Sequence, residues 1–214
     1  MTLALDRQLV AGLDALSVKL NTVQQQQLLD FLALLLKWNK VYNLTSIRQA
    51  EDMLTQHVMD CLSAVATVMH EAPDGKTLLD VGSGGGLPSV VFAIVHPHLQ
   101  VTAVDAVAKK AAFIQTAAHT LKLANLKGIH SRVELLEEKF DLVVSRAFAS
   151  LKDFTTWSDK ALRTGGTWVA MKGKVPEDEM AELPEGVRIQ GIQTLNVPGL
   201  DAHRCLIWLR RSLG

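Results

Sequence analysis

Four glycines within five residues mark the part of the sequence best suited to bind a ligand. They lie in Asp80–Pro88, which follows an apolar run and opens a predicted helix. Glycine permits tight turns and lets a ligand approach the backbone closely. In an open α/β sheet, such a loop lies at the carboxyl end of a strand, where ligands bind. The run therefore predicts a cofactor-binding loop, with a purely structural turn as the alternative.

The glycine loop does not match the patterns that bind phosphate groups. A dinucleotide-binding G-x-G-x-x-G pattern that begins at Gly82 has Leu87 in place of its third glycine. One that begins at Gly84 has Ser89 there, and the Gly-Lys-Ser/Thr ending of the Walker loop is absent. The carboxylate of Asp80, just before the loop, suits a cationic ligand better than a phosphate. These residues favour S-adenosylmethionine, which has a sulfonium and an amino group, over the ligand of a nucleotide-binding oxidoreductase or sensor.

Two further segments have the residue types expected around a nucleoside. Asp105 ends a second predicted strand, 25 residues after Asp80, and a carboxylate there can accept hydrogen bonds from both ribose hydroxyls. The alternative is that Asp105 only caps the following helix. The segment 131–134 follows a third predicted strand near Ile129 and can face the base, with a solvated charged loop as the alternative.

The elements that must position these residues follow from the pattern after Thr77. Short apolar runs alternate with helix-length segments, which predicts right-handed βαβ units and a parallel sheet with helices on both faces. A last pair of strands, with no helix between them, predicts an antiparallel end to the sheet. The predicted strands are Thr77–Val81, Leu99–Val104, Phe140–Ser145, Thr167–Met171, Val187–Leu195 and Arg204–Arg210; the predicted helices are Pro88–Val95, Ala108–Leu121 and Leu151–Leu162.

Roughly the first 70 residues have a helical pattern instead. Thr22 and Gln25 resemble a capping box, and apolar residues follow at helical spacing. A further helix is predicted over about residues 51–69, before a break at Pro73. We therefore predict a helical N-terminal extension over residues 1–71 and a cofactor-binding α/β domain over residues 72–214.

Composition narrows the class of protein. The chain is 48% hydrophobic, and its longest apolar runs fall far short of the roughly 20 residues that span a membrane. The two cysteines and seven histidines show no spacing typical of a disulfide framework or a metal site. The formal net charge is zero, so any nucleic-acid-binding face must be a local patch. We expect a cytoplasmic protein without a metal.

The motifs together resemble the bacterial glucose-inhibited division protein B family, whose members are guanine-N7 methyltransferases of small-subunit ribosomal RNA. The glycine loop alone indicates only the methyltransferase superfamily, whereas the flanking motifs are more specific. The sequence departs from the family at Ser89, where glycine is usual. The similarity covers nearly the whole chain and is carried by Lys37–Thr45, His57–Asp60, Asp80–Pro88, Ser131–Glu134, Ser145–Ala149 and Met171–Gly173.

The resemblance implies a class I, Rossmann-like methyltransferase fold, with a seven-stranded, mostly parallel sheet whose last strand is antiparallel. It also implies a monomer that transfers a methyl group from S-adenosylmethionine to N7 of one guanine in 16S rRNA or the small ribosomal subunit. A methyltransferase of the same fold that acts on a small molecule or a protein is the alternative. By family analogy the cofactor contacts are Gly82, Leu87, Val133, Glu134 and Arg146, to which the arguments above add Asp80, Gly84 and Asp105.

This reaction places few demands on acid–base residues. N7 of guanine has a lone pair and no proton to lose, so the enzyme supplies mainly orientation and electrostatics. Arg146 ends the fourth predicted strand, and we assign it the catalytic role of positioning cofactor and base through guanine O6. It cannot also hold N7, which must stay free to attack. The alternative is an arginine that only ties two helices together.

Contacts to the RNA are predicted mainly outside the glycine loop. Trp38 either stacks on RNA or anchors the extension on the core, and His57 either meets substrate or forms an internal pair with Asp60. Basic residues near predicted strand ends either contact phosphates or are solvated. The predicted substrate-binding residues are Trp38, Asn39, His57, Lys172 and Arg204.

Overall fold

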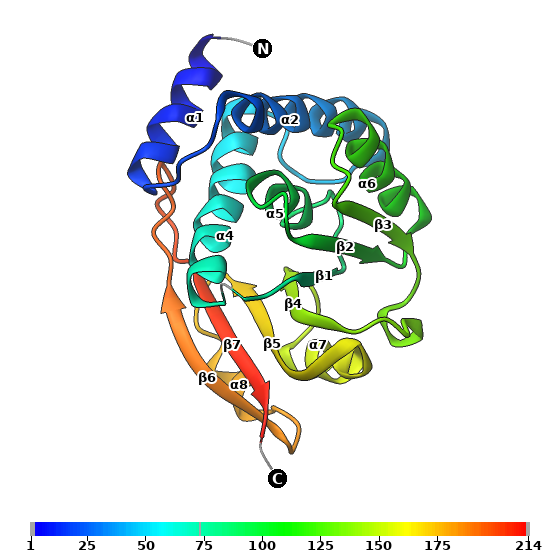
Figure 1. The fold of residues 1–214 in the computed structure, drawn as a ribbon. Coiled ribbons are helices and arrows are strands. Elements are labelled where there is room, and N and C mark those ends of the chain that lie inside the picture. The colour runs from blue at the N-terminus through cyan, green and yellow to red at the C-terminus, as the bar shows by residue number, and fades with distance from the viewer. Residues whose placement is uncertain (1–2, 73, 213–214) are drawn as a thin grey trace.

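The chain forms a seven-stranded sheet in a computed structural model that describes residues 3–72 and 74–212 (Figure 1). The strand order is β3-β2-β1-β4-β5-β7-β6. In this described part, β7 runs antiparallel to both of its neighbours, and the other paired strands are parallel. The predicted mixed sheet is therefore confirmed. The strands are β1 (Thr77–Val81), β2 (Gln100–Asp105), β3 (Leu126–His130), β4 (Phe140–Arg146), β5 (Leu162–Lys172), β6 (Val187–Thr194) and β7 (Cys205–Arg211).

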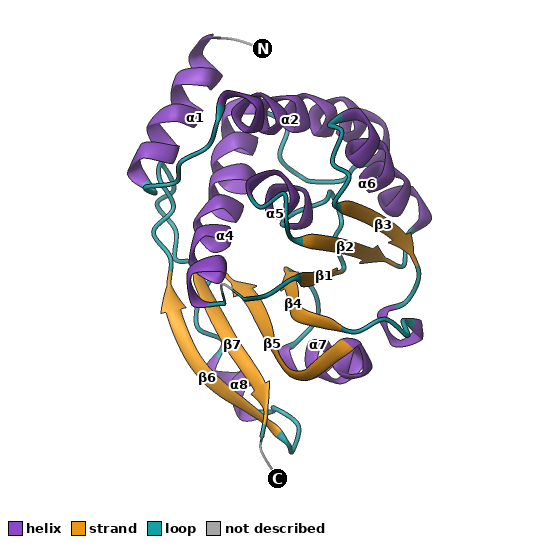
Figure 2. Ribbon diagram, in the orientation of Figure 1, coloured by secondary structure: helices purple, strands orange, loops and turns teal. Residues whose placement is uncertain are grey.

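Helices cover both faces of the sheet (Figure 2). The N-terminal helices pack with α5 and α6 on one face, and α7 and α8 lie on the other (Figure 1). None of the helices in the described ranges is long and apolar enough to cross a membrane. The helices are α1 (Leu3–Ala15), α2 (Thr22–Tyr42), α3 (Ala50–Met53), α4 (Asp60–Glu71), α5 (Ser89–Val95), α6 (Ala108–Thr120), α7 (Leu151–Ser158) and α8 (Glu177–Ala181).

The two sides of the sheet contribute to two apolar clusters, as the alternation of side chains along a strand requires. In β1, Leu78 packs with the N-terminal helices, whereas Leu79 and Val81 pack toward α7. The strand is buried on both faces, which explains its apolar residues Leu78, Leu79 and Val81; Asp80 is the polar side chain among them. Its carboxyl end leads directly into the glycine loop.

The N-terminal helices share one apolar cluster with the sheet and with α6. The ring of Phe31 lies 6.4 Å from that of Phe113, and the ring of Trp38 lies edge-on at 5.3 Å from the same phenylalanine. Trp38 therefore packs α2 against α6, in agreement with its predicted role as an anchor of the extension on the core. The division of the chain into domains at residue 72 stays a prediction, and the predicted break at Pro73 lies outside the described residues.

The start of α2 differs from the prediction by one residue. Asn21, not Thr22, is the N-cap, and its side chain accepts a hydrogen bond from the Gln24 backbone at 2.9 Å. The Gln24 side chain accepts one from the Asn21 backbone at 3.1 Å, which completes the capping box. Asparagine caps a helix as well as threonine does. The same Gln24 amide donates to Ile94 O at 2.8 Å, and Gln27 donates to Leu121 O at 2.8 Å, so α2 also caps the ends of α5 and α6.

The helix predicted over residues 51–69 contains a π-helical segment. Between α3 and α4, residues Leu54–Met59 form a π-helical segment, a feature that is frequent at functional sites. Another difference lies near β5, which starts at Leu162 rather than Thr167. Its first part contains Gly165 and Gly166, which interrupt the apolar pattern. α7 ends at Ser158, earlier than predicted, and a 3₁₀ turn over Asp159–Ala161 joins it to β5.

We predict that Phe31→Ala lowers the free energy of unfolding by about 3–5 kcal/mol, because its fully buried ring leaves a cavity between α2 and α6. Urea unfolding followed by circular dichroism measures this change. Val23→Ala on the exposed side of the same helix is the control, with an effect within about 0.5 kcal/mol. Equal effects of the two substitutions would show that α2 is not part of a cooperative core.

Candidate active site

The candidate site is a cavity of about 420 Å³ at the carboxyl ends of β1, β2 and β4. It combines acidic, basic and aromatic side chains with glycine-loop backbone. Four of the predicted cofactor contacts line it: Gly82, Asp105, Val133 and Glu134. The cavity is lined by Val81, Gly82, Val104, Asp105, Ala106, Lys110, Ser131, Arg132, Val133, Glu134, Ala147, Phe148 and Trp157.

The glycine loop is shaped by backbone conformations that other residues rarely adopt. Gly82 and Gly84 have φ values of +69° and +55°, in the left-handed region that glycine enters without cost. A Cβ on Gly82 would collide with the ring of Phe148, whereas one on Gly84 would meet only the Gly82 carbonyl oxygen at 3.8 Å. Gly82 N donates to Val104 O at 2.9 Å, which ties the loop to β2.

Asp105 connects the segment after β2 to the glycine loop, and its predicted contact with the ribose stays a prediction. Its Oδ1 accepts a hydrogen bond from Val107 N at 2.8 Å at the start of α6, and its Oδ2 accepts one from Gly84 N at 2.9 Å. Lys110 Nζ lies 3.9 Å from Oδ2. A carboxylate has about four acceptor positions, so Asp105 can brace the loop and still accept from a ligand in the cavity it lines.

Asp80 lies behind the loop, fully buried, and does not line the cavity. Its Oδ2 accepts a hydrogen bond from Ser89 N at 3.1 Å, and its Oδ1 has no partner among the described residues. Burial raises the pKa of Asp80 to about 6, against the opposing effects of the Ser89 hydrogen bond and the charge of Arg146. Gly84 and Leu87 also lie outside the cavity lining, so cofactor contact by these three residues stays a prediction.

The cavity wall opposite β2 is partly aromatic. Phe148 and Trp157 lie edge to face at 5.8 Å between ring centroids, and 39% of Trp157 is exposed. Ala147 has a left-handed φ of +51°, which turns the chain between Arg146 and Phe148. Sequence reasoning missed Trp157, because an aromatic residue on an amphipathic helix carries no signal of its own.

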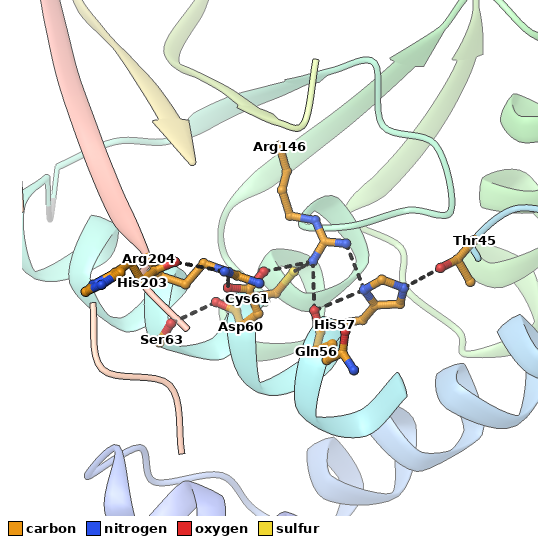
Figure 3. A network of polar contacts seen from close by, with 9 residues as sticks. All are labelled: Thr45, Gln56, His57, Asp60, Cys61, Ser63, Arg146, His203 and Arg204. Atoms are coloured by element: carbon orange, nitrogen blue, oxygen red, sulfur yellow. Dashed lines mark hydrogen bonds and ion pairs between the residues drawn. The ribbon is translucent and has the colours of Figure 1, made fainter. Parts of the chain in front are cut away.

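Arg146 belongs to a second, adjacent group of polar side chains (Figure 3). Its Nη1 donates to Asp60 Oδ2 at 3.0 Å, and its Nη2 donates to His57 Nδ1 at 2.8 Å. Arg204 Nε binds the other oxygen of the same aspartate at 2.9 Å. The predicted pair of His57 with Asp60 is therefore wrong, because both side chains bind Arg146 instead of each other. Arg146 does not line the cavity, and its contact with cofactor or base stays a prediction.

The other predicted substrate residues have internal partners. Lys172 Nζ lies 2.8 Å from Glu179 Oε2, and Arg204 is paired with Asp60 as described. Asn39 is 2% exposed; its amide donates to Ile47 O at 2.9 Å and accepts from Thr45 N at 2.8 Å. Its side chain therefore shapes the loop after α2, which corrects its placement on an RNA-facing surface.

Comparison with known proteins identifies the family. A sequence model of the family described as rRNA small subunit methyltransferase G matches residues 24–207. The ribosomal RNA small subunit methyltransferase G of Acidovorax sp. (strain JS42) is 56% identical over 208 residues, covering 93% of this chain and 92% of that protein. The chain belongs to this methyltransferase family. Its relative of the same name from Acidovorax ebreus (strain TPSY) is 56% identical over 216 residues, covering 97% and 96% of the two chains.

The fold of this methyltransferase also matches solved structures. The ribosomal protein L11 methylase from Lactobacillus delbrueckii subsp. bulgaricus superposes with a TM-score of 0.55 at 18% sequence identity, over 74% of this chain and 79% of that chain. A likeness at this identity concerns the fold alone. It agrees with the Rossmann-like sheet, so the family and the fold class expected from the sequence are both confirmed.

The raised pKa of Asp80 predicts a pH-dependent stability. The folded-state pKa of about 6 exceeds the ordinary value of 3.8, so protonation favours the fold. That contribution is fully present below about pH 4 and is lost as the pH rises through 6. Relative to Asp80→Asn, which cannot titrate, the wild type should lose about 3 kcal/mol of unfolding free energy across this range. Urea unfolding at several pH values measures it; a difference that stays constant with pH would refute the assignment.

Proposed function

We propose that this methyltransferase transfers the methyl group of S-adenosylmethionine to N7 of a guanine in 16S rRNA of the small ribosomal subunit. The observation that carries the proposal is the convergence of Gly82, Asp105 and the segment 131–134 on one cavity, in a chain whose relatives are named for small-subunit rRNA. The enzyme would act as a monomer in the cytoplasm.

The residues around the cavity fit the nucleoside part of this cofactor. Asp105 has acceptor positions left for the ribose hydroxyls, and Val133, Phe148 and Trp157 give an apolar surface against which a base can pack. The unpartnered Oδ1 of Asp80 lies just behind the loop and suits a cationic amino group, directly or through water. When bound, the cofactor supplies a methyl group on a positively charged sulfur.

The protein's own contribution to the reaction is positioning. N7 has no proton to lose, so no general base is required. Arg146 directly precedes Ala147 and Phe148, which line the cavity. From this position its guanidinium would orient the target base through O6. The aromatic pair would keep water away from the reacting groups, which strengthens the electrostatic effect of such a cation.

Contact with RNA requires a local basic patch, because Lys+Arg and Asp+Glu both number 22. Lys110 and Arg132 both line the cavity and would meet phosphates beside the target base. Arg132 is exposed and Lys110 lies 3.9 Å from Asp105 Oδ2, whereas Lys172 and Arg204 are held in closer ion pairs at 2.8 and 2.9 Å. The cavity mouth is therefore a better candidate for phosphate contact than the strand ends.

Calorimetric titration tests the cofactor. We expect S-adenosylmethionine to bind and NAD not to bind, and we expect Asp105→Ala to raise the Kd of S-adenosylmethionine by about 10- to 100-fold, since charge-assisted hydrogen bonds to the ribose are lost. Asp201→Ala, which removes an exposed carboxylate from the loop between β6 and β7, is the matched control. An unchanged Kd for Asp105→Ala would remove Asp105 from the cofactor site.

Methyl transfer tests the substrate. Labelled S-adenosylmethionine is offered with small ribosomal subunits, naked 16S rRNA, total protein or small metabolites, and N7-methylguanine is then mapped in the RNA. We expect label at one guanine of the rRNA and none in the other fractions. Label in protein or metabolites instead, or an unaltered N7-methylguanine pattern in cells that lack the enzyme, would overturn the substrate assignment.

A further inference from the structure

We propose that His57 is a positioning residue for methyl transfer: as a neutral hydrogen-bond acceptor, it sets the direction of the Arg146 guanidinium. This inference rests on the proposed function and assigns a role to a buried histidine that the reaction itself does not need. The observation behind it is a chain of contacts from the loop after α2, through the π-helical segment, to the end of β4 (Figure 3).

The protonation state of His57 follows from its neighbours. A guanidinium can only donate hydrogen bonds, so His57 Nδ1, at 2.8 Å from Arg146 Nη2, must accept. The proton is then on Nε2, which lies 2.7 Å from Thr45 Oγ1 and donates to it. Gln56 O lies 3.0 Å from Nδ1 but is an acceptor too, and it is satisfied instead by Arg146 Nη1 at 3.5 Å.

Burial and charge both keep this imidazole neutral. His57 is 7% exposed, and burial, followed by the charge of Arg146, lowers the pKa of His57 to about 4 against the opposing effect of the Gln56 carbonyl. A neutral acceptor fixes the orientation of a guanidinium without cancelling its charge. A second carboxylate in this position would hold Arg146 as firmly but would weaken its attraction for an electron-rich oxygen of a ligand.

Asp60 is the second side chain that holds the Arg146 guanidinium in place. Its two oxygens are shared between Arg146 and Arg204, at 3.0 and 2.9 Å, so Arg146 receives only part of one negative charge. His57 and Asp60 lie three residues apart. His57 is within the π-helical segment, and Asp60 is the first residue of α4. Together they bind Nη1 and Nη2 and leave Arg146 Nε without an acceptor among the described residues.

The contacts that hold Arg146 in place extend to the loop after α2. Asn39 accepts from the backbone of Thr45, and Thr45 accepts from His57. A movement of this loop, which begins within the family motif Lys37–Thr45, would thereby be passed to Arg146 through Thr45 and His57. This gives Asn39 and Thr45 a part in the same positioning, without any contact with the substrate.

The experiment compares His57→Asn, which keeps a neutral acceptor close to the position of Nδ1, with His57→Leu, which has none. We expect His57→Leu to lower kcat by about 10- to 100-fold with little change in KM for the RNA, since misplacement of a positioning group affects the reacting geometry. His57→Asn should recover most of this loss. His70→Leu, on the exposed side of α4, is the matched control and should behave as wild type.

A spectroscopic readout is independent of activity. Two-bond ¹H–¹⁵N spectra of ¹⁵N-histidine-labelled wild-type protein near neutral pH should show His57 as the neutral Nε2–H tautomer. An Nδ1–H tautomer or an imidazolium would refute the inference, as would full activity in His57→Leu or equal losses in both His57 variants. Failure of the proposed function would look different, because the wild type would then neither bind S-adenosylmethionine nor methylate RNA. If His57→Leu does not fold, the activity of His57→Asn and the tautomer of His57 in the wild type still test the inference.

Discussion

The carboxylate of Asp60, held between two guanidinium groups, is the interaction on which the site depends. It joins the start of α4 to the end of β4 through Arg146 and to the start of β7 through Arg204. The Asp60 side chain is 5% exposed, and those of Arg146 and Arg204 are 18% and 25% exposed, so loss of the carboxylate would leave two partly buried cations without their anionic partner and would destabilise the fold. The end of β4 in turn determines where Ala147 and Phe148 enter the cavity.

A second constraint comes from the crowding of backbone around the glycine loop. Asp105 braces Gly84, while Phe148 fills the space that a side chain on Gly82 would need. The loop, β2 and the turn after β4 therefore fit together only with glycine at residue 82. The cavity is a consequence of how three strand ends meet, and Gly82 and Asp105, two of its predicted ligand contacts, also have structural roles.

Much of this arrangement was predictable from local patterns. β1 was predicted with both bounds correct, because its mostly apolar residues lie between Lys76 and the glycine loop. The convergence of Asp105 with residues 131–134 followed from the rule that parallel strands end at one edge of the sheet. The internal partners of Asn39, Lys172 and Arg204 were not predictable, since they are set by contacts between distant segments. The π-helical turn was equally hidden, because its sequence has the spacing of an ordinary helix.

The glutamines at the start of α2 carry a consequence for the chemical ageing of the protein. Gln24 and Gln27 donate from their amide nitrogens to carbonyl oxygens at the ends of α5 and α6. Slow deamidation would turn each donor into a carboxylate that only accepts hydrogen bonds. The new negative charge would face carbonyl oxygens at the negative end of a helix dipole. A hydrolytic change far from the cavity would thus loosen the two helices that follow the glycine loop and Asp105.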